Sequence, residues 1–211
     1  MMVRRPLGLA LAALLLSATA QPAAAATATE QLKTAIDRVI LTLDNPSLKG
    51  DSRLLERRAA VRKIANEIFD FNEIARRSLG RYWQPLSDGQ RSEFVGLFAD
   101  LLERAYISKI ELYSGEKIVY SGEKVDGDLA SVSTKIMTKN GTEVPVDYRL
   151  FKKAEKWMIY DISVEGISLV SNYRTQFNKI IQTSGYDGLV DKMKNKQTEL
   201  AEEDSKKKAK N

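Results

Sequence analysis

The chain has 211 residues, a formal net charge of +5, and neither histidine nor cysteine. The missing residue types exclude disulfides, Cys–His nucleophiles and zinc sites built on His or Cys. Nucleic acid is not the expected partner, because Arg4, Arg5 and the segment Asp191–Asn211 hold most of the positive charge and leave a body of about +1.

The first 26 residues have the pattern of a secretory signal peptide. Arg4 and Arg5 form a basic start, the apolar run Leu7–Leu16 follows, and small residues before Ala20 or Ala26 offer a cleavage site. The apolar run is too short to span a bilayer comfortably. We expect residues 1–26 to be removed after export through the Sec pathway and the mature protein to be periplasmic; an uncleaved anchor is the alternative.

Four helices are predicted before residue 114, because apolar residues recur at helical spacing in each segment. Asn45-Pro46 ends the first helix and Gly80 ends the third. The predicted ranges are 29–45, 51–71, 70–80 and 87–113. The N-cap candidates are Asp51 or Ser52 for the second helix, Asp70 for the third, and Ser87 or Asp88 for the fourth.

The sequence changes character after residue 115. Segments rich in β-branched and aromatic residues occupy 117–125, 129–139, 142–153 and 156–165, and Asp126-Gly127 and Asn140-Gly141 mark turns between them. We predict a four-stranded antiparallel meander. An amphipathic helix ending at Gly185, a short helix and a charged tail follow. This order predicts an α+β domain over residues 27–194 and a disordered tail over residues 195–211.

Strict alternation along the predicted strands gives the sheet one apolar face. That face collects Val132, Thr134 and Ile136 from the second strand, Val144, Val146, Tyr148 and Leu150 from the third, and Met158, Tyr160, Ile162 and Val164 from the fourth. Alternation does not distinguish a filled core from a lined pocket. The residue pattern alone therefore reaches an exported α+β domain and leaves its function open.

Asp161 and Glu165 are the two carboxylates that could suggest catalysis. Four residues along a strand separate their backbones by roughly 13 Å, which exceeds the roughly 5–9.5 Å between the carboxyl groups of glycosidases. Gly166 permits a sharp turn after the strand, and Glu165 is placed to interact with the N-terminus of the next helix. We expect both carboxylates to be structural.

Several stretches together resemble the MlaC family of periplasmic phospholipid-binding proteins, also known as toluene-tolerance or ABC-transporter auxiliary components. They are LGRYWQPLSDGQRSEFVGLFADLLERAY (79–106), VDYRL (146–150), WMIYDISVEGISLVSNYRTQF (157–177) and GYDGLVDKM (185–193). The resemblance covers residues 32–194. Its order and spacing carry the likeness, since no single motif is decisive, and the first helices and the charged tail match less well.

The resemblance implies an NTF2-like cone with an apolar cavity that holds phospholipid acyl chains. On this basis the residues expected to line the cavity are Phe94, Leu97, Phe98, Leu101, Val132, Ile136, Val146, Tyr148, Leu150, Tyr160 and Ile162. The resemblance also implies a monomeric, non-catalytic carrier without metal or cofactor. Such a carrier would move lipid between an outer-membrane lipoprotein/porin complex and an inner-membrane MCE-domain ABC transporter, which maintains outer-membrane lipid asymmetry. A hopanoid-associated branch of the family is an alternative.

Basic residues crowd the second and third predicted helices. Arg76, Arg77 and Arg81 surround the third, and we expect them to dock the carrier on its partners, because long-range charge speeds reversible encounters. The alternative is a solvated basic face without a binding role.

Two other functions compete with the carrier. One is an isomerase-like enzyme on the same fold, pairing Tyr148 or Tyr160 with Asp147 or Asp161; alternation argues against it, because adjacent strand residues face opposite sides. The other is a non-catalytic envelope adaptor with a filled core.

Overall fold

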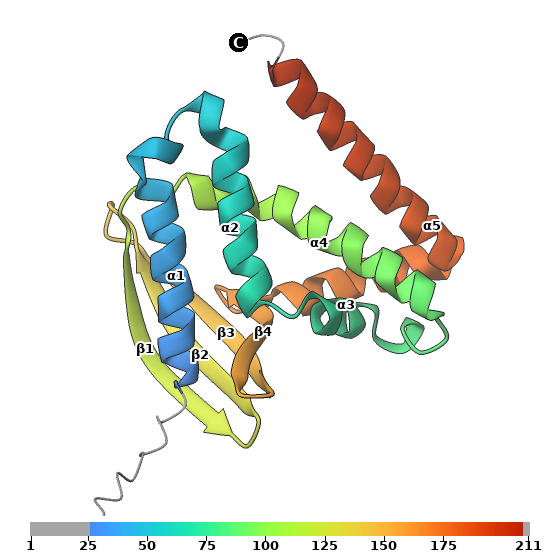
Figure 1. Cartoon of the computed structure of the whole chain (residues 1–211). Helices are drawn as coiled ribbons and strands as arrows, with labels where there is room; N and C mark the ends of the chain where they lie inside the picture. Colours follow the sequence, from blue (N-terminus) through green and yellow to red (C-terminus); the bar gives the residue numbers. More distant parts are fainter. Residues whose placement is uncertain (1–25, 209–211) are drawn as a thin grey trace, which may run out of the picture.

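The computed structural model describes residues 26–208, in which a curved antiparallel sheet carries helices on one face and around one end (Figure 1). The predicted signal peptide lies outside the described residues except for its last position. Across the described part of the chain, no helix combines the length and the apolar character needed to cross a membrane. The elements are α1 (Ala28–Asp44), α2 (Leu54–Ile68), α3 (Phe71–Leu79), the 3-10 turn η3 (Gly80–Tyr82), α4 (Asp88–Glu111), β1 (Lys117–Asp126), β2 (Leu129–Met137), β3 (Glu143–Lys153), β4 (Lys156–Val164), β5 (Ile167–Ser168) and α5 (Leu169–Lys208).

Side-chain caps fix where three of the helices begin. Thr27 and Glu30 form a capping box at α1, and Ser87 and Gln90 form one at α4. At α3 the Asp70 carboxylate accepts a hydrogen bond of 2.9 Å from the backbone N–H three residues on. These contacts satisfy backbone donors that lack a partner inside the helix. The predicted starts at Asp70 and Ser87 are therefore confirmed.

The predicted cap of the second helix is wrong. Asp51 and Ser52 lie in a 3-10 turn, and α2 begins at Leu54 without a side-chain cap. The guanidinium of Arg57, in the first turn of α2, instead donates to the carbonyl of Leu48 at 2.8 Å. A side chain of the helix thus binds the backbone of the preceding loop. The prediction was the reverse, that a loop side chain would cap the helix.

The sheet is antiparallel throughout, with the strand order β1-β2-β3-β4-β5. The predicted α+β class and meander are confirmed, with one addition: β5 pairs with the end of β4. Two residues are too short to show alternation, so the sequence pattern could not predict β5. The hairpin at Asn140-Gly141 also forms, and Gly141 has a φ of 79°, a conformation that glycine adopts without a steric cost.

A β-bulge in β4 changes which side chains face the helices. Leu150 pairs with Ile159 whereas the register beyond Arg149 is offset by one, so Tyr160 is the extra residue. Ile159 faces α1 and α2 on what we call the inner face of the sheet. Tyr160 turns to the outer face, with its ring centroid 6.2 Å from that of Phe151. The predicted placement of Tyr160 on the apolar inner face is therefore wrong, because alternation does not hold through a bulge.

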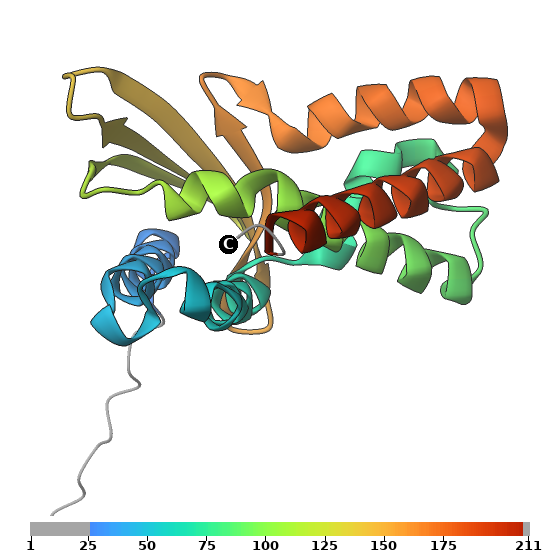
Figure 2. The ribbon, with the colours of Figure 1, turned by 90° about the horizontal axis from the view of Figure 1, so that it is seen from above.

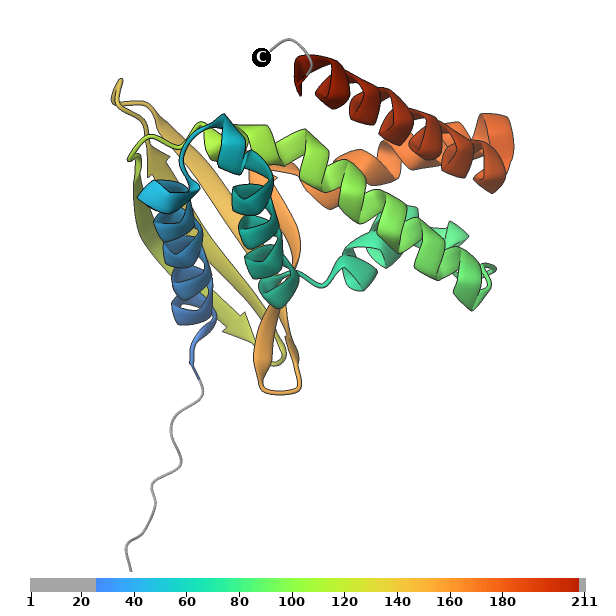
Figure 3. The same ribbon diagram turned by 45° about the horizontal axis from the view of Figure 1, so that its top comes forward.

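Two hydrophobic clusters form the interior. The elements that hold them form two groups in the ribbon, the sheet with α1 and α2 and the helices α3, α4 and α5 (Figures 2 and 3). The sheet cluster lies between the inner face and helices α1 and α2, and its buried members are Ala28, Leu32, Ala35, Ile64, Ile68, Ala130, Val132, Leu150, Trp157 and Ile159. The helical cluster joins α3, α4 and α5, and its buried members are Ile74, Ala75, Leu79, Leu86, Phe94, Phe98, Leu102, Val170, Phe177, Leu189 and Met193. Phe69 packs against both clusters and connects them.

The last helix reverses direction at Gly185, where φ is 71° and ψ is 176° (Figure 2). The part after this break folds back on the start of α4: the Tyr186 hydroxyl donates to the carbonyl of Gln90 at 3.0 Å, and Lys194 pairs with Glu93 at 2.6 Å. The predicted stop at Gly185 thus appears as a sharp turn. Helix α5 continues to Lys208, and the disorder expected of residues 195–211 stays a prediction.

Candidate functional site

The structure divides the eleven residues predicted to line a lipid cavity into three groups. The inner face of the sheet carries Val132, Ile136, Val146, Tyr148, Leu150 and Ile162. Helix α4 carries Phe94, Leu97, Phe98 and Leu101, which belong to the helical cluster or pack against it. The third group is Tyr160 alone, on the outer face. The sheet group and the α4 group therefore do not share one hydrophobic cluster.

The inner face is partly covered and partly available. Val132 and Leu150 are fully buried under α1 and α2, and Val146 is buried too. Tyr148 and Ile162, which pair with each other across β3 and β4, are only half-buried and pack at the margin of the sheet cluster. These two side chains leave apolar surface exposed next to a closed core, and an acyl chain could pack against that surface.

The aromatic residues of α4 are closely packed by other rings. Phe94 and Phe98 lie 5.8 Å apart by ring centroids, and the edge of Phe177 contacts them at 5.6 and 5.1 Å. Tyr173 adds a ring 4.9 Å from Phe98. Both phenylalanines have 1% exposure or less. This packing favours a core role for them, whereas Leu97 and Leu101 keep partial exposure.

A polar spot interrupts the inner face where β1, β2 and β3 meet. Thr134 is buried and donates to the carbonyl of Val146 at 3.0 Å. Tyr120, its partner across β1 and β2, has a buried hydroxyl without a hydrogen-bond partner among residues 26–208. Burial raises the pKa of Tyr148 to about 12 and also raises that of Tyr120. Both phenols therefore stay protonated near neutral pH and can donate hydrogen bonds.

A groove of about 330 Å³ opens between α1 and the start of β1, and Tyr120 lies in its lining. Ile36 and Ile40 of α1 and Ile118 of β1 supply its apolar side chains, and Lys33, Asp37, Glu116 and Lys117 make the rest of the lining charged. Tyr120 was not predicted as a site residue, because alternation is ambiguous along its strand and does not show which face Tyr120 is on. The register, which pairs it with Thr134, is what places it on the inner face.

The two suspected carboxylates have structural surroundings. Asp161 is buried and accepts hydrogen bonds from the Ser168 hydroxyl at 2.6 Å and from the Val170 N–H at 3.0 Å, so it caps the start of α5. Glu165 has a φ of 50° in the turn, and the capping role expected of it belongs to Asp161. Both acids of the alternative Tyr–Asp pair are engaged in the fold, since Asp161 caps α5 and Asp147 accepts a hydrogen bond of 2.6 Å from the Ser133 hydroxyl.

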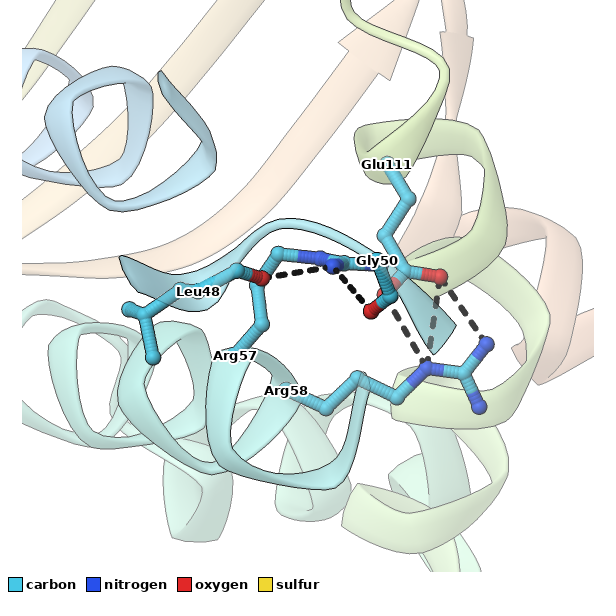
Figure 4. A network of polar contacts seen from close by, with 5 residues as sticks. All are labelled: Leu48, Gly50, Arg57, Arg58 and Glu111. Atoms are coloured by element: carbon cyan, nitrogen blue, oxygen red, sulfur yellow. Dashed lines mark hydrogen bonds and ion pairs between the residues drawn. The ribbon is translucent and has the colours of Figure 1, made fainter. Parts of the chain in front are cut away.

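The basic side of α2 is used to hold α4. Arg58 donates to the Glu111 carboxylate at 2.9 and 3.2 Å, and Arg57 lies 3.4 Å from the same carboxylate (Figure 4). Arg62 pairs with Glu103 one turn further on. These arginines are therefore ion-paired within the fold.

The three arginines predicted to dock a partner do gather at one place. Arg76, Arg77 and Arg81 line a cleft of about 660 Å³ between η3 and the first half of α5. Arg174 lines the same cleft and was missed, because it lies 97 residues from Arg77, whose carbonyl it contacts. No local pattern in the sequence signals that distant approach. Proximity to Arg76 and Arg77 lowers the pKa of Glu73, so this carboxylate stays ionised beside them.

Comparison with known proteins places the fold in one family. The family model described as MlaC protein matches residues 33–195. The intermembrane phospholipid transport system binding protein MlaC of Haemophilus influenzae is 30% identical over 120 residues, which is 54% of this chain and 56% of that protein. Toluene tolerance protein ttg2D of Pseudomonas putida is 27% identical over 130 residues, which is 61% of this chain and 60% of that protein.

A solved structure supports the same assignment. The phospholipid-binding protein from Ralstonia solanacearum, determined in complex with a phospholipid, has a TM-score of 0.76 and 28% sequence identity, over 83% of this chain and 99% of that one. The two curated relatives are matched over less than two thirds of their own lengths, whereas the family match spans most of the described chain. On this evidence the chain belongs to the MlaC family.

Proposed function

We propose that this protein is a phospholipid-binding component of an intermembrane transport system and that its cargo lies against the inner face of the sheet. The observation that carries the proposal is the structural match to a protein solved with a bound phospholipid. That match extends over nearly all of the neighbour's chain, so it includes the part that holds its lipid.

The energetics suit a carrier. A phospholipid with two chains of about sixteen carbons exposes apolar surface that costs roughly 20 kcal/mol or more in water, at about 0.8 kcal/mol per CH₂. A carrier must cover most of that surface. The half-buried side chains of Ile136, Tyr148 and Ile162 provide apolar area beside a core that is already closed. The Tyr120 hydroxyl, which is buried and has no hydrogen-bond partner in the described part of the chain, offers a hydrogen bond to an ester carbonyl of the lipid.

The finer proposal concerns transport. We infer that the carrier is periplasmic and moves lipid between an outer-membrane lipoprotein/porin complex and an inner-membrane MCE-domain ABC transporter. The names of the curated relatives, which refer to intermembrane phospholipid transport and toluene tolerance, support this role. Catalysis is not part of the proposal, since Asp161 is a helix cap and Asp147 is hydrogen-bonded to Ser133.

Native mass spectrometry of the protein purified from its cells tests the cargo. We expect an additional mass of a phospholipid, identified by fragmentation of the released lipid. A hopanoid mass would change the cargo class. Protein that carries no lipid after gentle purification, and takes none from phospholipid vesicles, would contradict the proposal and favour an envelope adaptor.

A further inference from the structure

The cleft between η3 and α5 concentrates positive charge. Four guanidinium groups line it, from Arg76, Arg77, Arg81 and Arg174, and no acidic residue is among its lining residues in the described chain. Its volume of about 660 Å³ is within the range of roughly 300–1,000 Å³ that is typical of ligand clefts. It is therefore large enough for several side chains of another molecule.

Two of the four guanidinium groups share one carboxylate within the fold. Arg76 and Arg77 both contact the single carboxylate of Glu73, each at 2.6 Å. The guanidinium of Arg77 also lies 4.0 Å from the centre of the Tyr160 ring, which the bulge in β4 places on the outer face. One carboxylate serves two arginines here, so this side of the cleft keeps a positive charge.

The other two guanidinium groups, of Arg81 and Arg174, have no acidic partner among residues 26–199. Arg81 donates to the Tyr82 hydroxyl at 2.8 Å and to the Asn178 side-chain oxygen at 3.4 Å. Arg174 donates through Nε to the carbonyl of Arg77 at 2.7 Å. These neutral acceptors hold both guanidinium groups in place without cancelling their charge. A planar fork held in this way is pre-organised for a carboxylate.

We propose that this cleft docks an acidic segment of a protein partner, one that presents two or more Asp or Glu side chains. A single phosphate would occupy only a small part of its volume. Carboxylates spaced along a segment would instead reach the Arg81–Arg174 side and the Arg76–Arg77 side together.

The cleft is separate from the proposed cargo surface, and the inference rests on the proposed function. Its lining includes Leu79, a buried member of the helical cluster, whereas the inner face of the sheet belongs to the sheet cluster. A partner bound at the cleft would leave the inner face uncovered. The carrier could therefore stay docked while lipid enters or leaves.

The test measures binding of a fluorescent hexaglutamate peptide to the purified protein by anisotropy at low ionic strength. Thr175→Glu places a carboxylate among the arginines of the cleft without removing any of them. Thr183→Glu is the matched control, because both threonines are exposed on α5 and donate to the carbonyl four residues earlier, at 3.1 and 3.2 Å. We expect Thr175→Glu to weaken peptide binding by about tenfold or more, because the new carboxylate can pair with the guanidinium groups of the cleft and compete with the peptide. Thr183→Glu should weaken peptide binding by less than about twofold, because its carboxylate lies outside the cleft.

A second pair of variants removes charge. The double variant Arg81→Gln with Arg174→Gln should bind the peptide about tenfold or more weakly, because hydrogen bonds between charged groups are stronger than those between neutral groups. Lys49→Gln with Lys124→Gln changes the net charge equally at exposed sites away from the cleft and should have little effect. Binding by the unmodified protein should weaken as salt rises. An uncharged peptide of the same length should not bind.

The proposal is overturned if hexaglutamate binds no better than the uncharged peptide, or if Thr175→Glu and Thr183→Glu behave alike. It is also overturned if the Arg81/Arg174 double variant binds phosphatidylglycerol vesicles more weakly than the unmodified protein does but binds the peptide equally well. The cleft would then contact membranes. Co-purifying phospholipid, measured on the same variants, reports on the cargo separately. Lipid retained with no peptide binding would reject the docking cleft alone.

Discussion

At the residue scale, Tyr120 has a buried hydroxyl to which the cargo could supply a hydrogen-bond acceptor. Its hydroxyl is buried on the inner face without a partner among the described residues, and burial keeps it protonated by raising its pKa. A buried, unsatisfied hydroxyl costs about 1–3 kcal/mol. An ester carbonyl of a bound lipid would accept its hydrogen bond and remove that cost.

We therefore predict opposite effects of Tyr120→Phe on stability and on cargo. The lipid-free variant should be as stable as the unmodified protein or more stable, because the unsatisfied hydroxyl is gone. Its bound lipid should be released about three- to tenfold faster, because the variant lacks one modest hydrogen bond to the lipid. Urea unfolding and the transfer of a fluorescent phospholipid to acceptor vesicles measure the two effects.

Tyr186→Phe is the control, since the Tyr186 hydroxyl has a partner in the helical cluster, the carbonyl of Gln90. This variant should lose about 1 kcal/mol of stability and keep its lipid release rate. Equal release rates for Tyr120→Phe and the unmodified protein would mean that the Tyr120 hydroxyl does not contact the cargo.

Elements were easier to predict than their details. Hydrophobic periodicity and the Asn140-Gly141 turn were enough to place the helices and the antiparallel meander, because both signals are local. The bulge at Tyr160 was not predictable, since it is a property of the pairing of β4 with β3 and leaves no local signal in the sequence. The approach of Arg174 to Arg77 has the same cause, a tertiary contact between α5 and the end of α3. Alternation therefore placed most of the inner face correctly and failed where a strand departs from regular pairing.

The contact between α2 and α4 gives a stability prediction at the element scale. Glu111 joins two arginines of α2, and its side chain is 12% exposed, so Glu111→Gln leaves two partly buried guanidinium groups without their acid. Hydrogen bonds to charged groups contribute about 1.5–3 kcal/mol, and we expect a loss in that range. Chemical denaturation measures it.

Glu56→Gln is the matched control, because the Glu56–Arg53 pair lies on the same helix with both side chains more than half exposed. Solvent screens such a pair, and its loss should cost less than about 1 kcal/mol. If the two substitutions cost the same, Glu111 does not clamp α2 to α4.

At the scale of the whole molecule, the two proposed tasks fall on different hydrophobic clusters. The sheet cluster leaves half-buried apolar side chains at its margin, where cargo is proposed to lie. The helical cluster is closed by packed rings and supports the arginine cleft on its surface. The family resemblance led to the expectation of one cavity lined by both the sheet and α4. The structure instead assigns Phe94 and Phe98 to a core, which alternation and helical periodicity cannot distinguish from a cavity lining.

The most direct test of the central claim compares two tyrosines of neighbouring strands that face opposite ways. A photo-crosslinking residue is introduced at Tyr148, on the inner face, or at Tyr160, on the outer face, and the lipid-loaded protein is irradiated. Mass spectrometry then measures the fraction of protein joined to phospholipid, with the exposed Lys153 as background. We predict capture at Tyr148 and only background capture at Tyr160. Capture at Tyr160 with none at Tyr148 would contradict the assignment of the inner face as the cargo surface.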